Sequence, residues 1–352
     1  MHFASDNTGP VHPKVMEALV KANEGYAMPY GADPGMVRVT QTLRDIFEAP
    51  EAAVYLVPLG TAANSLILAC LSQPWETIFC HKTSHIQEDE CNAPEFYTGG
   101  TKLTLIDGAA GKMDPGALRS AIAAEEGRGV HGPQRGPISI TQATEKGAVH
   151  SLDEIRAITD IARSFGLKTH MDGARFANAL VHLGCSPAEM TWKAGIDAVS
   201  FGGTKNGLMG VEAVVFFDPS HAWEFELRRK RGAQLISKHR YLSAQMEAYL
   251  TGDLWLDLAR RANAAAKRLS EGLSAVPDIR LHHEVQANLF FADLPRRLHR
   301  RLHEAGVEYY LWEGDLDGPD PDEPLTARFV ADWSAAESDT DALLALLAPE
   351  TV

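Results

Sequence analysis

The chain has 352 residues, 45% of them hydrophobic and 23% charged, so it is long enough to bury a full core and has the composition of an ordinary globular protein. Its formal net charge of -14 makes nucleic acids and anionic membrane surfaces poor partners. The N-terminus lacks the basic and apolar segments of a secretory signal, and no apolar run is long enough to span a membrane. We therefore expect a cytoplasmic protein.

Apolar, β-rich runs alternate with helical patterns through the first 250 residues. This alternation predicts an α/β fold with a mostly parallel sheet covered on both faces. Helix starts are marked at Asp114-Pro115 and by two capping boxes, Ser151 with Glu154 and Ser186 with Glu189. In such a fold the ligand crevice lies beyond the carboxyl ends of the strands. The expected strands are 53–58, 77–80, 102–106, 137–142, 167–171, 197–201 and 213–217.

The pattern changes near residue 250. A long amphipathic helix is expected there, followed by short strands and a last helix near 338–348, which together predict a smaller α+β domain. We therefore expect a large domain over 1–250, including the N-terminal segment, and a small C-terminal domain over 251–352. The apolar positions of the long helix are Leu258, Ala262, Ala265, Leu269 and Leu273, and the strands are expected near 288–292, 307–311 and 326–330.

Three groups of residues have plain structural interpretations. The basic runs at 228–231 and 296–301 fall in helical patterns and are predicted to be solvated helix faces. The acidic segment 313–324 is predicted to be an exposed loop, with a substrate lid as the alternative. The cysteines match no zinc or redox motif, so no metal site is expected and the thiols are predicted to be reduced, buried and inert. They are Cys70, Cys80, Cys91 and Cys185.

Two polar side chains follow neighbouring predicted strands. Asp172 comes after strand 167–171, and Lys205 follows 197–201 in a Gly-Gly-Thr-Lys turn. Alone, the aspartate could be a helix N-cap and the lysine a solvated charge. The same four letters end at Lys102, but that copy precedes its strand and should point away from the crevice. A lysine and an aspartate at the ligand edge are the pair that pyridoxal phosphate (PLP) requires: the lysine binds its aldehyde and the aspartate faces its pyridine nitrogen.

Further strand ends carry candidates for the rest of such a site. Gly60 and Thr61 open a helix after strand 53–58, where backbone amides can bind phosphate, although they match neither a P-loop nor a dinucleotide motif. His85, after strand 77–80, could stack on a flat ring or move protons, or be a structural histidine. Arg175 and Arg328 could each bind a carboxylate, or form surface ion pairs.

Eight motifs together resemble the low-specificity L-threonine aldolases and phenylserine aldolases of the β-eliminating-lyase group. The resemblance covers nearly the whole chain and implies the aspartate-aminotransferase-like PLP fold, fold type I, with a large domain and a smaller C-terminal α+β domain. The most specific motifs are HMDGARFANA and SFGGTKNG, together with the distance between them. The motifs are SDN (5–7), YG (30–31), GTAAN (60–64), SHIQEDE (84–90), TQATEKG (141–147), HMDGARFANA (170–179), SFGGTKNG (200–207) and ARF (327–329).

The resemblance also implies residue roles. Lys205 would form the Schiff base with PLP, Asp172 would pair with the pyridine nitrogen, and His85 would stack on the ring. Phosphate would lie at Gly60 and Thr61, and Arg175 would contact cofactor and substrate. The remaining implied roles are substrate-carboxylate binding by Ser5, Arg175 and Arg328, a contribution of Tyr30 from a neighbouring subunit, a second histidine, His131, near the aldehyde, and a place for Arg231, Lys238 and Arg240 at a subunit interface near the phosphate.

The implied reaction is retro-aldol cleavage of threonine, allo-threonine or phenylserine, through the substrate's Schiff base with PLP, to glycine and an aldehyde. The base is open between His85, His131 and a water between them. Alternatives are β-elimination or transamination, a PLP-binding regulatory protein without activity, and a nucleotide-binding module. The implied assembly is a homodimer or homotetramer with shared sites. His150 stands where the family usually has a tyrosine, and we expect the structure to tolerate this change. Ala32 stands where the family often has an aspartate, which we expect to affect substrate preference.

Overall fold

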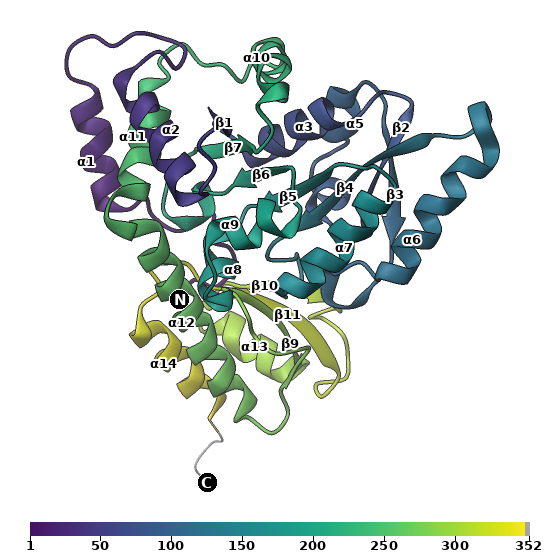
Figure 1. The fold of residues 1–352 in the computed structure, drawn as a ribbon. Coiled ribbons are helices and arrows are strands. Elements are labelled where there is room, and N and C mark those ends of the chain that lie inside the picture. Colours follow the sequence, from purple (N-terminus) through teal and green to yellow (C-terminus); the bar gives the residue numbers. More distant parts are fainter. Residues whose placement is uncertain (349–352) are drawn as a thin grey trace.

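The computed structural model describes residues 1–348, apart from the side chain of Glu126, and contains two β-sheets (Figure 1). The larger sheet has seven strands, and all the strands predicted for it are present within three residues of their expected bounds. In spatial order they are β1 (Ala53–Val57), β7 (Glu212–Phe216), β6 (Ala198–Phe201), β5 (Thr169–Gly173), β4 (Gln134–Thr141), β2 (Glu76–His81) and β3 (Lys102–Ile106).

The large sheet is mostly parallel, as predicted. Strands β6, β5, β4, β2 and β3 form one parallel set, whereas β7 is antiparallel to both of its neighbours, β6 and β1. Every residue of β5, β6 and β7 is buried, because helices cover both faces of the sheet. The carboxyl ends of the parallel strands consequently meet at one edge, where polar side chains are brought together.

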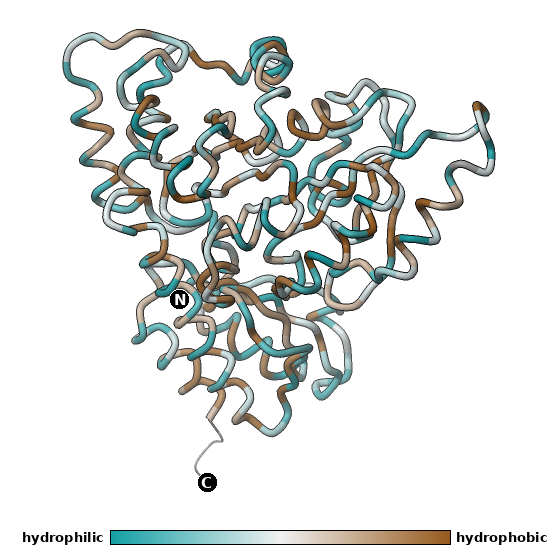
Figure 2. Tube along the Cα trace, in the orientation of Figure 1, coloured by the Kyte–Doolittle hydropathy of each residue, from teal (hydrophilic) through white to brown (hydrophobic). Residues whose placement is uncertain are grey.

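Two separate hydrophobic clusters mark the two faces of this sheet. On one face α3 and α10 pack through Leu66 and Phe225, and on the other α7 and α8 pack through Ile158 and Phe176. Figure 2 shows the hydrophobic residues concentrated where helices meet strands. The helices of this part are α1 (Pro13–Ala22), α2 (Pro34–Ile46), α3 (Gly60–Leu71), α4 (His85–Glu88), α5 (Ala93–Thr98), α6 (Pro115–Ala124), α7 (Leu152–Ser164), α8 (Phe176–Leu183), α9 (Pro187–Met190), α10 (Ala222–Arg231) and α11 (Arg240–Leu250).

The predicted helix starts are confirmed. Ser151 and Ser186 each form a reciprocal capping box, with Glu154 and Glu189, at the starts of α7 and α9. Asp114 caps α6 by accepting the backbone N–H of Ala117. These local signals act over three residues, which is why they can be recognised without knowledge of the fold.

The C-terminal part is built on α12 (Leu254–Ser274) and an antiparallel sheet ordered β10-β11-β9-β8. One predicted strand is displaced: 307–311 was expected, but β10 begins three residues later, and the two-residue β8 was not predicted. Phe3 from the N-terminus packs into this second core. The domain division near residue 250 stays a prediction. The other elements are β8 (Arg280–Leu281), β9 (Leu289–Pro295), α13 (Arg296–Glu304), β10 (Tyr310–Glu313), β11 (Pro324–Val330) and α14 (Glu337–Leu347).

The prediction that both basic runs are solvated helix faces is wrong at two positions. Arg296, at the start of α13, is 1% exposed and binds the acidic segment through Glu323 and two backbone carbonyls. Arg229 is buried against Leu56 and pairs with Glu226. The reason is long-range: a buried guanidinium is stabilised by acceptors that lie far away in the sequence.

The cysteine prediction holds for two of the four thiols. Cys70 and Cys80 are buried, and burial raises the pKa of each to about 12, which makes them unreactive. Cys91 is exposed and Cys185 is partly exposed, contrary to the prediction. Cys91 lies in a left-handed turn between α4 and α5, where the chain reverses at the surface. Among residues 1–348, no helix is long and apolar enough to cross a membrane.

Candidate active site

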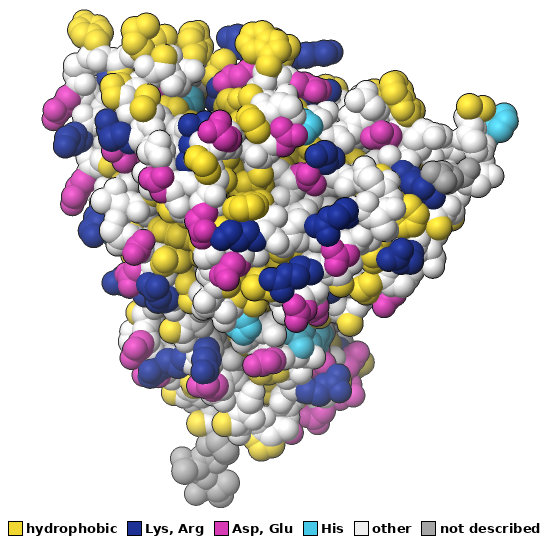
Figure 3. Space-filling view, in the orientation of Figure 1, with side chains coloured by type: hydrophobic (Ala, Val, Ile, Leu, Met, Phe, Trp, Pro, Cys, Tyr) yellow, Lys and Arg dark blue, Asp and Glu magenta, His cyan; other side chains and the backbone are white. Residues whose placement is uncertain are grey.

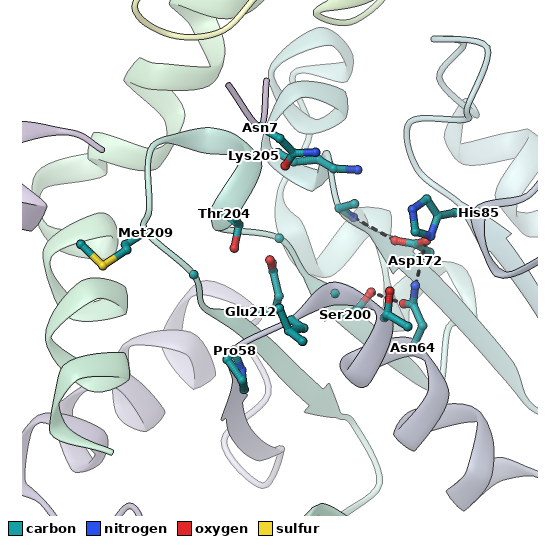
Figure 4. Close-up of a pocket in the computed structure, with 16 residues that line it drawn as sticks. Asn7, Pro58, Asn64, His85, Asp172, Ser200, Thr204, Lys205, Met209 and Glu212 are labelled. Atoms are coloured by element: carbon teal, nitrogen blue, oxygen red, sulfur yellow. Dashed lines mark hydrogen bonds between the residues drawn. The ribbon is translucent and has the colours of Figure 1, made fainter. Parts of the chain in front are cut away.

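Two adjoining cavities lie at the carboxyl ends of the parallel strands. The first, of about 350 Å³, is lined by the ends of β1, β5 and β6 and the start of α3 (Figure 4). The second, of about 280 Å³, is lined partly by β10 and β11 of the C-terminal sheet. Asn7, His85 and Lys205 line both. A ligand with a flat ring in the first cavity could therefore present its reactive end to the second.

Lys205 reaches these cavities because the chain turns sharply after β6. A Cβ atom at Gly202 would lie 2.4 Å from the carbonyl oxygen of Ala174, so only glycine allows this close passage. Lys205 forms no ion pair or side-chain hydrogen bond within the described chain. Lys102, the copy of the motif, is exposed at the start of β3 and lines neither cavity. The predicted contrast between the two lysines is thus present in the structure.

Asp172, at the end of β5, is a carboxylate at 3% exposure. One oxygen accepts the backbone N–H of Ala174 at 3.0 Å, and the other accepts Nδ2 of Asn64 at 3.0 Å. Within residues 1–348 no lysine or arginine pairs with it. It is not the N-cap of α8, a position that Arg175 takes. A buried carboxylate without a cation is costly, and a protonated ring nitrogen would compensate it.

The start of α3 offers a cradle for an anion. Leu59 occupies the N-cap and makes no side-chain cap hydrogen bond, which leaves the first-turn amides of this 12-residue helix without a side-chain partner. Gly60 and Thr61 line the first cavity, and a Cβ atom at Gly60 would meet nothing within 4 Å. Free amides and the positive end of the helix dipole at an open cavity suit a phosphate group.

His85 is held by a residue that the sequence reasoning missed. Its Nδ1 lies 2.8 Å from Oε1 of Glu90, which is fully buried. Burial lowers the pKa of His85, but the hydrogen bond to Glu90 and the charges of Asp172 and Glu145 outweigh burial and raise it. His85 therefore retains a proton more readily than an isolated histidine.

Asn64 and Ser200 are further missed residues that connect this network. Asn64 donates from Nδ2 to both Asp172 and Glu90, and its Oδ1 accepts the hydroxyl of Ser200 at 2.8 Å (Figure 4). One available signal was an asparagine inside the largely apolar helix α3, where a polar side chain needs a buried partner.

Glu212 braces the turn that carries Lys205. Its carboxylate accepts the backbone N–H of Gly203 at 2.7 Å, and it lines the first cavity. Burial raises the pKa of Glu212 to about 7. Sequence reasoning missed this residue because it starts the antiparallel strand β7, whose amino end, not its carboxyl end, reaches the cavity.

The two candidate arginines of the second cavity have different surroundings. Arg175 donates from Nε and Nη2 to both oxygens of Asp6, at 2.8 and 2.9 Å. Two of its three nitrogens are thus held by Asp6, and its expected contact with a substrate stays a prediction. Arg328 has no carboxylate partner in the described part of the chain, and burial, then the charge of Arg175, lower its pKa. Because Asp6 neutralises Arg175, Arg328 is the arginine of the two whose positive charge has no carboxylate partner in the described chain. Ser5 lines the same cavity.

Two predicted site residues line neither cavity of their own chain, and the expected contribution of Tyr30 to a neighbouring subunit's site stays a prediction. Tyr30 is 48% exposed, lies under the ammonium group of Lys230, and lines neither cavity. His131 is exposed at the end of an arm beyond α6 and also lines neither. The other predicted residues come together around the two cavities. They are Ser5, Gly60, Thr61, His85, Asp172, Arg175, Lys205 and Arg328.

Comparisons with known proteins found similar sequences and similar folds. The family model of the beta-eliminating lyases matches residues 2–295. The low specificity L-threonine aldolase of Pseudomonas aeruginosa is 40% identical over 339 residues, covering 96% of this chain and 93% of the relative. A threonine aldolase structure from Leishmania major superposes with a TM-score of 0.91 at 24% identity, covering 98% of both chains. A structure of SPT with a PLP internal aldimine gives 0.69 at 16%, covering 99% and 86%. The expected fold type I is confirmed.

Proposed function

This chain belongs to the beta-eliminating lyase family, and from this premise we propose that it is a PLP-dependent aldolase that cleaves threonine and related β-hydroxy-α-amino acids to glycine and an aldehyde. The observation that carries the proposal is that Lys205 and the buried Asp172 line one cavity. In the described chain Lys205 forms no ion pair or side-chain hydrogen bond, and no lysine or arginine pairs with Asp172. The beta-eliminating lyase match and the aldolase relative support the same reading.

The residues of the first cavity fit PLP. Lys205 would hold the aldehyde, Asp172 would face the ring nitrogen, and the start of α3 would receive the phosphate at Gly60 and Thr61. When bound, PLP supplies an aldehyde that condenses with amines and a ring that accepts an electron pair. A negative Asp172 favours the protonated ring nitrogen and so strengthens this acceptor at the moment when charge develops.

The second cavity orients the substrate. Arg328, whose guanidinium lacks a carboxylate, would bind the substrate carboxylate, assisted by the hydroxyl of Ser5 and the remaining nitrogen of Arg175. The β-hydroxyl group would then face His85, which lines both cavities. His85 would remove the hydroxyl proton as the Cα–Cβ bond breaks, giving the aldehyde, and Cα would take up a proton to give glycine.

The reaction is tested by product analysis. The purified protein, loaded with PLP, is incubated with threonine, allo-threonine and phenylserine, and glycine and aldehyde are measured together with keto acid and ammonia. We expect equal amounts of glycine and aldehyde. Formation of keto acid and ammonia would instead indicate β-elimination, and keto acid without ammonia would indicate transamination.

We also propose that a second copy of the chain covers the face near α10. Large hydrophobic side chains gather along this edge of the molecule (Figure 3). Among residues 1–348, Lys205 is the only lysine or arginine that lines the first cavity, so the phosphate charge lacks a dedicated cation there. A partner presenting Arg231, Lys238 and Arg240 would supply one. The exposed hydrophobic residues are Tyr26, Met28, Tyr30, Leu59, Met209, Trp223 and Leu227.

A further inference from the structure

Glu90 is a buried acidic residue that lines neither cavity. It follows α4, five residues after His85, and its side chain is fully buried. Its Oε1 contacts both His85 and Asn64, whereas its Oε2 has no hydrogen-bond partner in the described chain. Buried carboxyl groups are costly to place, so a half-satisfied one beside a reactive histidine calls for a functional explanation.

The hydrogen-bond directions around Glu90 follow from Asn64. The amide oxygen of Asn64 accepts the hydroxyl of Ser200, so its NH₂ group must face Glu90 and Asp172. Reversing the amide would place its oxygen against two carboxyl groups. An ionised Glu90 accepts hydrogen bonds only, so Nδ1 of a neutral His85 must carry the proton and donate it to Oε1.

The protonation of the other ring nitrogen, Nε2, follows from this arrangement. His85 lines both cavities, and its Nε2 makes no hydrogen bond within the described residues. With the proton of the neutral ring on Nδ1, Nε2 carries a lone pair and can accept a proton from a substrate. The tautomer of a histidine is set in this way by the partner of its other nitrogen.

We propose that Glu90 is a positioning residue that fixes His85 in the Nδ1–H tautomer and compensates the charge that the ring gains when Nε2 takes the substrate's hydroxyl proton. This inference rests on the proposed function. It assigns the base, which sequence left open, to His85 without a contribution from His131, and it gives Asn64 the task of holding the Glu90 carboxyl in place.

The charged groups around His85 predict how the pH dependence of the rate should change when Glu90 is replaced. A ring nitrogen of His85 and a carboxylate oxygen from each of Glu90 and Asp172 lie within 4.8 Å of one another. The charges of Glu145 and Lys205 also act on the imidazole. Three of these neighbours are acids and one is a base, so removing Glu90 must lower the pKa of His85. The acid limb of the rate profile should therefore move to lower pH when Glu90 loses its charge.

The test compares Glu90→Gln with Glu90→Leu. Glutamine keeps an acceptor for Nδ1–H and removes the charge, whereas leucine removes both. We expect kcat for threonine to fall by about 10²-fold in Glu90→Gln and further in Glu90→Leu, with the acid limb displaced by about one pH unit or more and little change in KM. Glu51→Gln, which removes the same charge from an exposed position, is the matched control and should behave as wild type.

A second readout separates positioning from general damage. Histidine-selective ¹⁵N labelling of the PLP-loaded protein reports the tautomer of His85, assigned by the signal lost in His85→Asn. The neutral wild-type ring should be protonated on Nδ1, and Glu90→Leu should lose this preference while retaining the visible PLP band. A wild-type ring protonated on Nε2, or a Glu90→Gln enzyme with an unmoved acid limb, would overturn the proposal. A wild-type protein without the PLP band would instead overturn the proposed function.

Discussion

At the scale of single residues, the two arginines of the second cavity should respond differently to the same substitution. Arg328→Lys replaces a fork by a point charge and should raise KM for threonine by roughly tenfold or more, the equivalent of about 1.4 kcal/mol, with an unchanged melting temperature. The reason is that Arg328 has no internal carboxylate to lose in the described chain. Steady-state kinetics and a melting curve on one preparation check both parts.

Arg175→Lys should act first on stability. It weakens a buried bidentate pair with Asp6, and breaking such a pair costs about 3–5 kcal/mol. Chemical denaturation of the PLP-free protein measures this loss. A variant as stable as wild type but with a raised KM would contradict a mainly structural role for Arg175. That role could not be judged from sequence because nothing near Arg175 in the chain identifies Asp6 as its partner.

At the scale of elements, Arg296 ties the acidic segment between β10 and β11 to α13. Its guanidinium is buried, and Arg300 one turn later also donates to carbonyls of that segment. Arg296→Met should lower the free energy of unfolding by about 1–3 kcal/mol, because it leaves the half-exposed Glu323 and several carbonyls without their donor. Arg280→Met, at a site whose side chain is 83% exposed, should change it by less than about 0.5 kcal/mol. Equal stabilities in urea denaturation would contradict this assignment.

Sequence predicts the elements where the signal is local. Central strands such as β7 are buried on both faces and appear as largely apolar runs, and capping boxes mark helix starts within three residues. The carboxyl ends of parallel strands then place Asp172 and Lys205 together. Glu90 and Asn64 were missed because their importance lies in contacts with each other across distant elements. Arg296 was misread for the same reason.

At the scale of the whole molecule, stability should fall in mild acid. Burial lowers the pKa of His150 and of His170 to about 4, whereas an unfolded chain titrates near 6.5. Between these values the unfolded state binds protons that the native state does not, so each residue's contribution is complete above pH 6.5 and is lost as the pH falls toward 4, by up to about 3 kcal/mol. Between pH 8 and pH 4 the free energy of unfolding should fall less steeply in His150→Gln than in wild type. In the exposed control, His303→Gln, it should fall as steeply as in wild type. An equal slope in all three proteins would exclude His150.

Assembly is the second property at this scale. Trp223 is 72% exposed on the proposed interface, and Trp75 is 63% exposed away from α10. Trp223→Glu should reduce the sedimenting mass and weaken PLP binding, because a buried charge opposes association and the partner's cations are lost. Trp75→Glu should do neither. Sedimentation velocity and PLP titration provide the measurements, and wild-type behaviour of Trp223→Glu would remove the interface from this face.

The most direct test of the account is to trap the cofactor on the protein. The protein is loaded with PLP, reduced with borohydride, digested, and the labelled peptide is identified by mass spectrometry in the wild type, Lys205→Ala and Lys102→Ala. We predict a visible absorption band that reduction abolishes and a label confined to the peptide of Lys205, lost in Lys205→Ala and retained in Lys102→Ala. A protein that takes up no PLP, or a label that remains in Lys205→Ala, would contradict the central claim.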